Sequence, residues 1–201
     1  MSLESSGRTR PRLFDDPLAI RALAHPTRLA LYLLVGRDGP ITAAEAARQV
    51  DISQALASHH LRQLAKYGFV EPAEPGDSRE RPWQTTSTSF STGSVQENPE
   101  LAGATSVLHE LVAERALANL VDWHARRADW EPRWQDVTGA GSSTLYLTYD
   151  ELRELNEKLG DLIRPLALRR PVGEPAARPA DAVPVSLCQI ITPLPPTSSG
   201  G

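Results

Sequence analysis

The 201-residue chain carries 25 Asp and Glu against 21 Lys and Arg, for a net charge of −4, and 40% of its residues are apolar. This length and apolar content suffice for one packed domain of roughly 100–150 residues with an extension behind it. No stretch approaches the ~20 apolar residues that span a bilayer, and the Arg-rich residues 1–12 lack the apolar run of a signal peptide. We therefore expect a cytoplasmic protein with no membrane partner.

Two further counts limit the chemistry of the chain. Its single cysteine, Cys188, excludes an intramolecular disulfide and a zinc cluster built on several cysteines of one chain. Residues 1–90 hold 11 Lys and Arg against 10 Asp and Glu, whereas residues 91–201 hold 10 against 15. Because the first part is only weakly basic, binding to nucleic acid would depend on where individual charges lie.

The first part of the chain predicts a flexible arm over residues 1–13 and a domain over residues 14–90. Apolar spacing from Asp15 onward predicts two short helices, of which the second begins at Pro26 and ends at Gly36 and Gly39-Pro40. Two capped helices then follow. Thr42 and Glu45 form a capping box for residues 43–50, and Ser53 caps residues 54–67, which Gly68 ends.

A change of period after Gly68 predicts a β-hairpin. Residues 69–71 and 83–86 have the composition of short strands, and residues 75–79 between them have turn chemistry. Residues 87–99 are predicted to be a polar link.

Residues 91–192 predict a largely helical extension for dimerisation or sensing. A long helix is expected from Leu101 to about Trp130, and Thr148 caps a second one over residues 149–164. Residues 183–192 are rich in β-forming residues and are expected to pair with residues 144–148, while the tail 193–201 is disordered by composition. The predicted fold is mainly α with a small β component: a winged helix-turn-helix domain, then a helical extension with a short two-stranded β element.

The order helix, helix, helix, turn, helix, hairpin is typical of a winged helix-turn-helix, in which the helix at 54–67 enters the major groove. We expect its inward residues Leu56, Leu61 and Leu64 to pack on Leu29 and Leu33. The candidate DNA-binding residues of its outward face are Gln54, Ser58, His59, Arg62 and Gln63, with Arg79 and Arg81 on the wing. The alternative for this polar face is simple solvation. His60 is expected to pack or to contact phosphate, and Arg28 to pair with a carboxylate or a helix end.

The segments "LAHPTRLALYLL" (23–34) and "DISQALASHHLRQLAKYGFVE" (51–71) resemble ArsR-type regulators. The matching residues are His25, Pro26, Arg28, Ser53, Ser58, His60, Leu61, Leu64, Gly68, Phe69 and Val70. The resemblance covers roughly residues 15–88. It implies a homodimer on an inverted-repeat operator in double-stranded DNA, usually acting as a repressor.

A sensor site is harder to predict from the residues. Asp122 and His124 have the opening spacing of a metal-sensing motif of that family, but no later His completes it, so we expect neither a metal nor a cofactor. Aromatic residues gather in the extension, and a small organic effector is the alternative to a core or a dimer seam. The candidate ligand-binding residues are Trp123, Trp130, Trp134 and Tyr146.

These patterns bear on three classes of function. The sequence favours a sequence-specific transcriptional regulator, and a winged-helix protein-interaction module without direct DNA binding is the alternative. No nucleophile–base set, phosphate-binding glycine loop or recognisable carboxylate pair is present, so we expect no enzyme.

Overall fold

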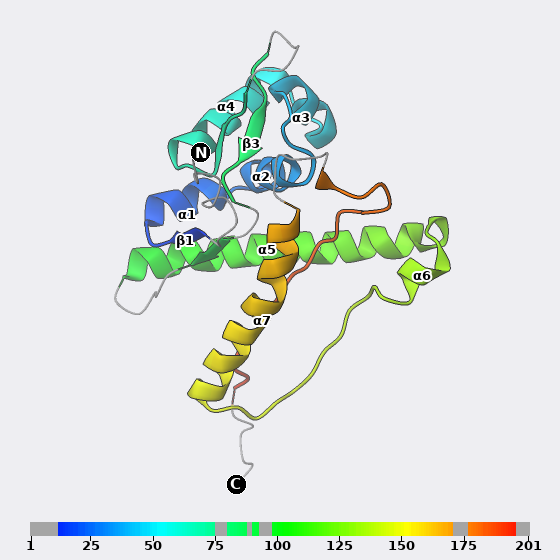
Figure 1. The fold of residues 1–201 in the computed structure, drawn as a ribbon. Helices are drawn as coiled ribbons and strands as arrows, with labels where there is room; N and C mark the ends of the chain where they lie inside the picture. Colours follow the sequence, from blue (N-terminus) through cyan, green and yellow to red (C-terminus); the bar gives the residue numbers. More distant parts are fainter. Residues whose placement is uncertain (1–11, 75–79, 88–89, 93–97, 171–176, 196–201) are drawn as a thin grey trace, which may run out of the picture. The chain divides into compact units, whose positions relative to one another are not determined.

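The computed structural model describes residues 12–74, 80–87, 90–92, 98–170 and 177–195 (Figure 1). The chain divides into two units, residues 1–111 with 142–184 and residues 112–141 with 185–201. The first unit contains the helices and the hairpin of the predicted DNA-binding domain. The predicted fold class, mainly α with a small antiparallel sheet and a helix-turn-helix domain, is confirmed.

Four helices open the first unit: α1 (Pro17–Leu23), α2 (Pro26–Asp38), α3 (Ala43–Val50) and α4 (Gln54–Lys66). The start of α2 at Pro26 and the Thr42–Glu45 capping box of α3 are confirmed. The prediction that Gly36 helps to end α2 is wrong, because the helix continues to Asp38. A glycine inside a helix costs only about 1 kcal/mol, which the buried Leu34 and Val35 beside it offset.

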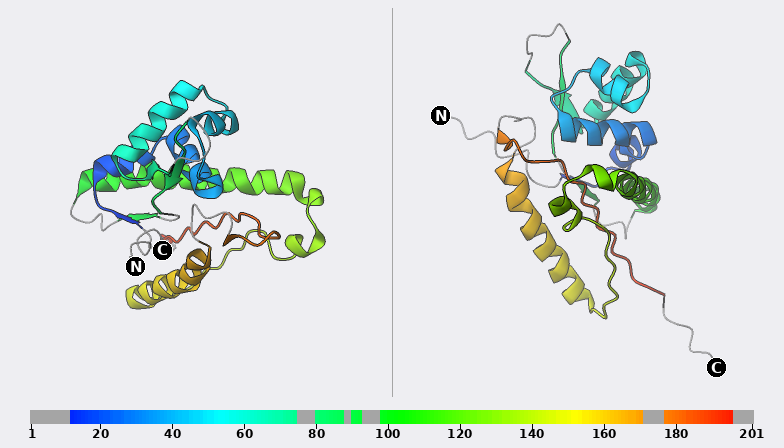
Figure 2. Two further views of the ribbon diagram at one scale, coloured as in Figure 1. Left: turned by 45° about the horizontal axis from the view of Figure 1, so that its top comes forward. Right: turned by 90° about the vertical axis from the view of Figure 1, so that its right-hand side faces the viewer.

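A short antiparallel hairpin follows α4, as predicted. Strand β2 (Val70–Pro72) pairs with β3 (Trp83–Thr85), with Val70 opposite Thr85 and Pro72 opposite Trp83. Trp83 also forms an isolated bridge with Ile41, which joins the hairpin to the chain between α2 and α3. Figures 1 and 2 show α2, α3 and α4 gathered beside this hairpin from three directions.

A second sheet was not predicted from the sequence. Strand β1 (Arg12–Phe14) pairs in parallel with β4 (Phe90–Thr92). These strands fall at the end of the segment predicted as a flexible arm and within the predicted polar link. A three-residue strand gives too short a pattern to be recognised, and its pairing across more than 70 positions leaves no local trace.

The core of the first unit is formed by apolar side chains from all four helices and the hairpin. Among the largest fully buried ones are Ile20, Leu23, Leu31, Leu61, Leu64, Phe69 and Val70. The buried Tyr32 ring meets Phe69 edge-on, and its hydroxyl donates to the carbonyl oxygen of Ser87 at 2.9 Å. This bond satisfies the polar end of a core side chain and ties α2 to the chain after β3.

The extension contains two long helices, α5 (Pro99–Arg126) and α7 (Tyr149–Arg169), with η2 (Arg127–Asp129) and α6 (Pro132–Gln135) between them. In α5 the first turns are buried at Leu101, Ala104 and Leu108. The Thr148 cap of α7 is confirmed, and it has a complete capping box with Glu151. The helix runs past the predicted end at residue 164 and includes Pro165.

The predicted β element of the extension is wrong. Neither residues 144–148 nor residues 183–192 form a strand, and no pairing joins them. The side chains of Leu145, Val185, Leu187 and Ile190 are all more than 60% exposed. β-Forming composition describes side chains that suit a sheet, but it does not supply the neighbouring strand.

Within the described residues, no single helix is long and apolar enough to cross a membrane. Helices α1 and α2 pass the length and composition test only as a pair, and they meet at an angle of 83°.

Candidate nucleic-acid interface

A left-handed residue makes the turn between α3 and α4. Asp51 follows α3 with φ 56° and ψ 52°, a conformation that Asp tolerates better than most residues. The N–H of Ile52 donates to the carbonyl oxygen of Ala47 at 3.0 Å, and Ser53 Oγ accepts from the N–H of Leu56 at 3.2 Å. These bonds close α3 and fix the start of α4 within three residues.

The buried side of α4 is formed by Ala57, His60, Leu61 and Leu64. This spacing of three and four residues defines one face of a helix. The prediction that Leu56 and Leu33 belong to this packing is wrong, because they are 41% and 39% exposed. Ala57 takes the inward place expected of Leu56, and its small side chain is fully buried.

The opposite side of α4 is polar and accessible, as the sequence predicts. Gln54, His59 and Arg62 are exposed, whereas Ser58 and Gln63 are half-buried. Arg62 has no hydrogen-bond or ion-pair partner among the described residues, so its guanidinium is not committed to the fold. One face of a 13-residue helix therefore presents donors and acceptors of the kinds that read base edges and phosphates.

The hairpin adds a second group of polar side chains beside α4. Arg81 is exposed, and its Nε lies 3.4 Å from the carbonyl oxygen of Ala73, within reach for donation. Glu80, just before β3, accepts a 2.6 Å hydrogen bond from Nε2 of Gln54 at the start of α4. Arg79, predicted to act beside Arg81, lies outside the described residues. The described part of the hairpin thus contacts the exposed end of the helix predicted to read DNA.

His60 lies behind the exposed face and packs against the N-terminus of α2. Its ring is 5.0 Å from that of His25, centroid to centroid, and its Nδ1 is buried without a hydrogen-bond partner among the described residues. Burial, and then repulsion from His25, Arg28 and His59, lowers the pKa of His60. Burial supports the packing role for His60 over contact with phosphate.

His25 and Arg28 hold the junction of α1 and α2. His25 Nδ1 accepts from the N–H of Thr27 at 3.2 Å and caps α2, so this nitrogen carries no proton. Arg28 donates from Nη2 to the carbonyl oxygen of Arg21 at 3.1 Å and from Nε to that of Ala22. Arg28 therefore pairs with the end of a helix, one of the two roles expected for it.

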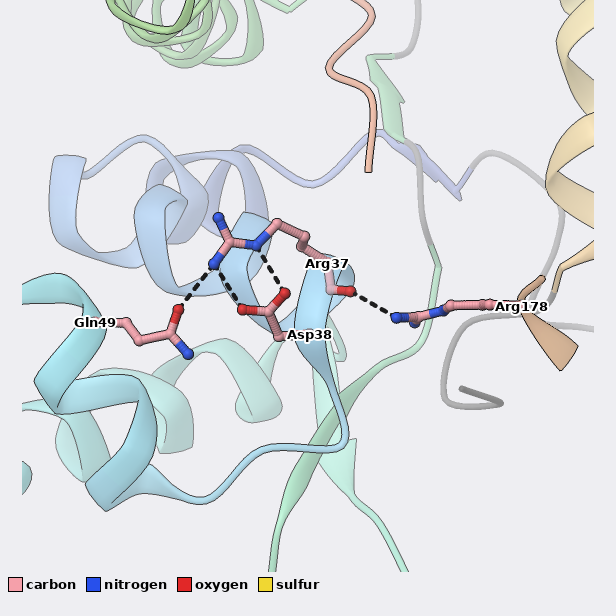
Figure 3. A network of polar contacts seen from close by, with 4 residues as sticks. All are labelled: Arg37, Asp38, Gln49 and Arg178. Carbon is pink, nitrogen blue, oxygen red and sulfur yellow. Dashed lines mark hydrogen bonds and ion pairs between the residues drawn. The ribbon is translucent and has the colours of Figure 1, made fainter. Parts of the chain in front are cut away.

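A second polar network joins the end of α2 to α3 (Figure 3). Arg37 donates to both carboxylate oxygens of Asp38, at 2.8 and 2.6 Å, and to Oε1 of Gln49 at 2.8 Å. These bonds from Arg37 lower the pKa of Asp38, although partial burial opposes the shift. Arg178 donates from Nη1 to the carbonyl oxygen of Arg37 at 3.2 Å, so residues near 178 are anchored to the same helix end.

Three of the four predicted effector residues form a cluster in the second unit. The ring centroids of Trp123 and Trp130 are 5.7 Å apart, and those of Trp130 and Trp134 are 6.3 Å apart. Trp123 and Trp134 are half-buried, and Trp130 is 36% exposed. Tyr146 is fully exposed, and no ring contact joins it to another described aromatic residue.

A separate groove of about 440 Å³ lies between α1 and the beginning of α5. Its lining is mostly small and apolar, with one ion pair of 3.9 Å between Arg21 and Glu100. The residues that line it are Arg21, Ala24, Pro99, Glu100, Gly103, Ala104 and Val107. None of the predicted effector residues contributes to it. In the described part of the chain, no three His, Cys, Asp or Glu side chains are arranged to hold a metal ion.

Sequence reasoning missed the contact between Glu80 and Gln54. The two residues are 26 positions apart, and no periodicity relates a hairpin residue to the first residue of a helix. The turn signal at residues 75–79 predicted a hairpin, but not that one of its residues would meet the start of α4.

Comparison with known proteins supports the helix-turn-helix assignment. Residues 23–73, which contain α2, α3, α4 and β2, match a family described as a helix-turn-helix domain. A 64-residue stretch is 30% identical to the arsenic resistance transcriptional regulator ArsR1 of Pseudomonas putida, covering 32% of this chain and 50% of that protein. The chain thus matches about half the length of this curated relative. Taken with the geometry, the family match identifies residues 23–73 as a helix-turn-helix domain, and the second match shows that part of the chain is similar to an arsenic resistance regulator.

Proposed function

We propose that the chain is a transcriptional repressor that binds an inverted-repeat operator in double-stranded DNA as a homodimer. The observation that carries this proposal is the outward face of α4, where Gln54, His59 and Arg62 are exposed beside the hairpin. A helix of this length with such a face fits the major groove, and the hairpin fits the neighbouring backbone. The ArsR1 match supports the same class of function.

The net charge of the chain affects the affinity for DNA and its dependence on salt concentration. The net charge of the whole chain is −4, so long-range attraction to DNA is weak and local contacts must supply the affinity. Each phosphate that a Lys or Arg neutralises contributes a slope of about −0.9 to the plot of log affinity against log salt concentration. We expect a slope between about −3 and −6 per dimer, from a few such contacts in each protomer.

Exposed apolar side chains on the long helices support the homodimer. Val107, Leu117 and Val121 of α5 are 48–62% exposed. In α7 the leucines recur at alternating intervals of three and four residues, the pattern of a helix that packs against another helix. They are Leu152, Leu155, Leu159, Leu162 and Leu166. Pairing would place two copies of α4 about 34 Å apart, one turn of DNA.

The experiment selects bound sequences from random duplexes with the purified chain and then measures affinity for the selected site by fluorescence anisotropy. Arg62→Glu is expected to lower affinity by about tenfold or more, because it replaces a cation that has no partner among the described residues by an anion at the proposed DNA-facing surface. Arg127→Glu makes the same charge change at an exposed site in the second unit and serves as the matched control. Equal losses in both variants would contradict a specific role for α4.

The alternative is a protein-interaction module, which the net charge of −4 would suit. Failure of the chain to bind any duplex at low salt, with its helical content intact, would favour this alternative.

The mass of the chain in solution tests the dimer separately. Leu117→Arg is expected to give monomers at micromolar concentration, whereas Ala118→Arg, at the exposed neighbouring position, is expected to leave dimers.

A small organic effector remains part of the proposal, with the cluster of Trp123, Trp130 and Trp134 as its binding site. Support comes from the contacts among the three indole rings and their partial exposure. The anionic aromatic dye 8-anilinonaphthalene-1-sulfonate is a suitable probe, and Trp130→Ala is expected to abolish the increase in its emission on binding to the protein. Unchanged dye emission in that variant would exclude the cluster as the site.

A further inference from the structure

The contact between Gln54 and Glu80 joins the two elements that meet DNA in the proposed function. Gln54 is the first residue of α4, directly after its Ser53 cap, and Glu80 lies three residues before the start of β3 at Trp83. Nε2 of Gln54 donates to Oε1 of Glu80 at 2.6 Å, a distance typical of a bond strengthened by charge. Both side chains are exposed, so the pair lies at the accessible surface.

A carboxylate determines which way a glutamine amide points. The Gln amide group has a donor end and an acceptor end, whereas an ionised Glu can only accept. The Nε2 group must therefore face Glu80, which leaves Oε1 and the second Nε2–H of Gln54 directed away from the carboxylate. A water molecule or a hydroxyl in the place of Glu80 would not impose this choice.

The groups left free on Gln54 match the major-groove edge of one base. Adenine offers an N6 donor and an N7 acceptor, and a Gln amide binds both through its oxygen and its nitrogen. We propose that Glu80 is a positioning residue that orients Gln54 for adenine at one base pair of each half-site. This inference rests on the proposed DNA-binding function and adds the determinant of base preference at the N-terminus of α4.

The charge of Glu80 has a second effect on specificity. A carboxylate beside the DNA-facing surface repels phosphates at every sequence, so it weakens nonspecific binding. The same charge lies near the N-terminus of α4, where a helix favours negative groups. Removal of Glu80 is thus expected to raise affinity for arbitrary DNA while it lowers discrimination between bases.

The test compares the base preferences of five forms of the full chain, each determined by selection from random duplexes. They are the wild type, Glu80→Ala, Gln54→Ala, the double variant, and Glu74→Ala. Glu74 is an exposed acid of the same hairpin and, among the described residues, forms no hydrogen bond or ion pair with α4, so Glu74→Ala controls for lost negative charge. Glu80→Ala is expected to reduce the adenine preference at one position of each half-site by about three- to tenfold and to leave the other positions unchanged.

The double variant separates positioning from a direct effect of the carboxylate. Once Gln54 is absent, removal of Glu80 is expected to change no base preference, and only affinity for arbitrary DNA is expected to rise. Glu74→Ala is expected to leave the whole profile of preferences as in the wild type. Identical profiles for Glu80→Ala and Glu74→Ala would overturn the inference.

A measurement without DNA distinguishes failure of the inference from failure of the proposed function. In the ¹⁵N-labelled free protein, the side-chain NH₂ signals of Gln54, identified by their loss in Gln54→Ala, are expected to shift in Glu80→Ala and to stay in place in Glu74→Ala. If they do not shift, the pair does not exist and the inference fails alone. If they shift but the wild type selects no sequence, the proposed function fails and the inference falls with it.

Discussion

The orientation of α4 about its own axis can be tested by two leucines on the same helix. Leu61 is fully buried, whereas Leu56, five residues earlier, is 41% exposed. Replacing Leu61 by Ala removes three buried carbon atoms, each worth about 0.8 kcal/mol of burial, and leaves a cavity. The free energy of unfolding is therefore expected to fall by about 3 kcal/mol. Leu56→Ala removes the same atoms from a partly solvated site without a closed cavity, and the expected loss is about 1 kcal/mol or less.

Urea denaturation followed by the helical circular dichroism signal measures both losses at one fixed protein concentration. With a denaturant slope of about 2 kcal/mol per molar, Leu61→Ala is expected to lower the midpoint by about 1.5 M and Leu56→Ala by less than about 0.5 M. Ala57→Leu completes the set, since a larger side chain at that fully buried position is expected to cost about 1–3 kcal/mol. A larger loss for Leu56→Ala than for Leu61→Ala would mean that α4 presents a different face to the core, and the proposed DNA-facing surface would be refuted with it.

Three further predictions concern stability. Burial lowers the pKa of His60 from its usual 6.5, so on acidification this residue is protonated in the unfolded chain before it is protonated in the folded chain. The free energy of unfolding should therefore be greatest above about pH 6.5 and should fall as the pH is lowered to about 5.5. The urea midpoint should fall less over this range in His60→Gln. Ser53→Ala removes the cap of α4 and should cost about 1 kcal/mol in the same assay, with no loss contradicting the capped start. Gly160→Ala should raise the thermal midpoint, because a methyl group there meets open space in the middle of α7, whereas Gly39→Ala should lower it, because its Cβ would lie 2.4 Å from the carbonyl oxygen of Val35.

The elements of the helix-turn-helix could be predicted because their signals are local. Thr42 and Glu45 are three residues apart, Ser53 lies directly before its helix, and Pro26 fits only the first turn. Each of these residues acts on backbone groups within four positions of itself, so the sequence contains the whole interaction. The outward polar residues of α4 followed from the same helical period.

The features that could not be predicted from the sequence depend on partners distant in the sequence. Leu56 and Ala57 are adjacent, and the choice of which one faces inward depends on the elements that pack against α4, which no local pattern contains. The β-rich residues 183–192 lacked a strand to pair with, and the β1–β4 pairing joins segments of only three residues each. The bond from Gln54 to Glu80 likewise exists only because the hairpin returns to the start of α4.

The burial of Leu101, Ala104 and Leu108 at the start of α5 determines where the helix-turn-helix domain could be separated from the rest of the chain. These side chains complete the core of the unit that contains α1 to α4. A fragment that ends at residue 98 would therefore expose to water the apolar side chains that they cover. Such a fragment is expected to aggregate on expression, while one that ends after Leu111 should remain in solution. A recombination event that fuses this domain to another protein therefore has to include the first three turns of α5.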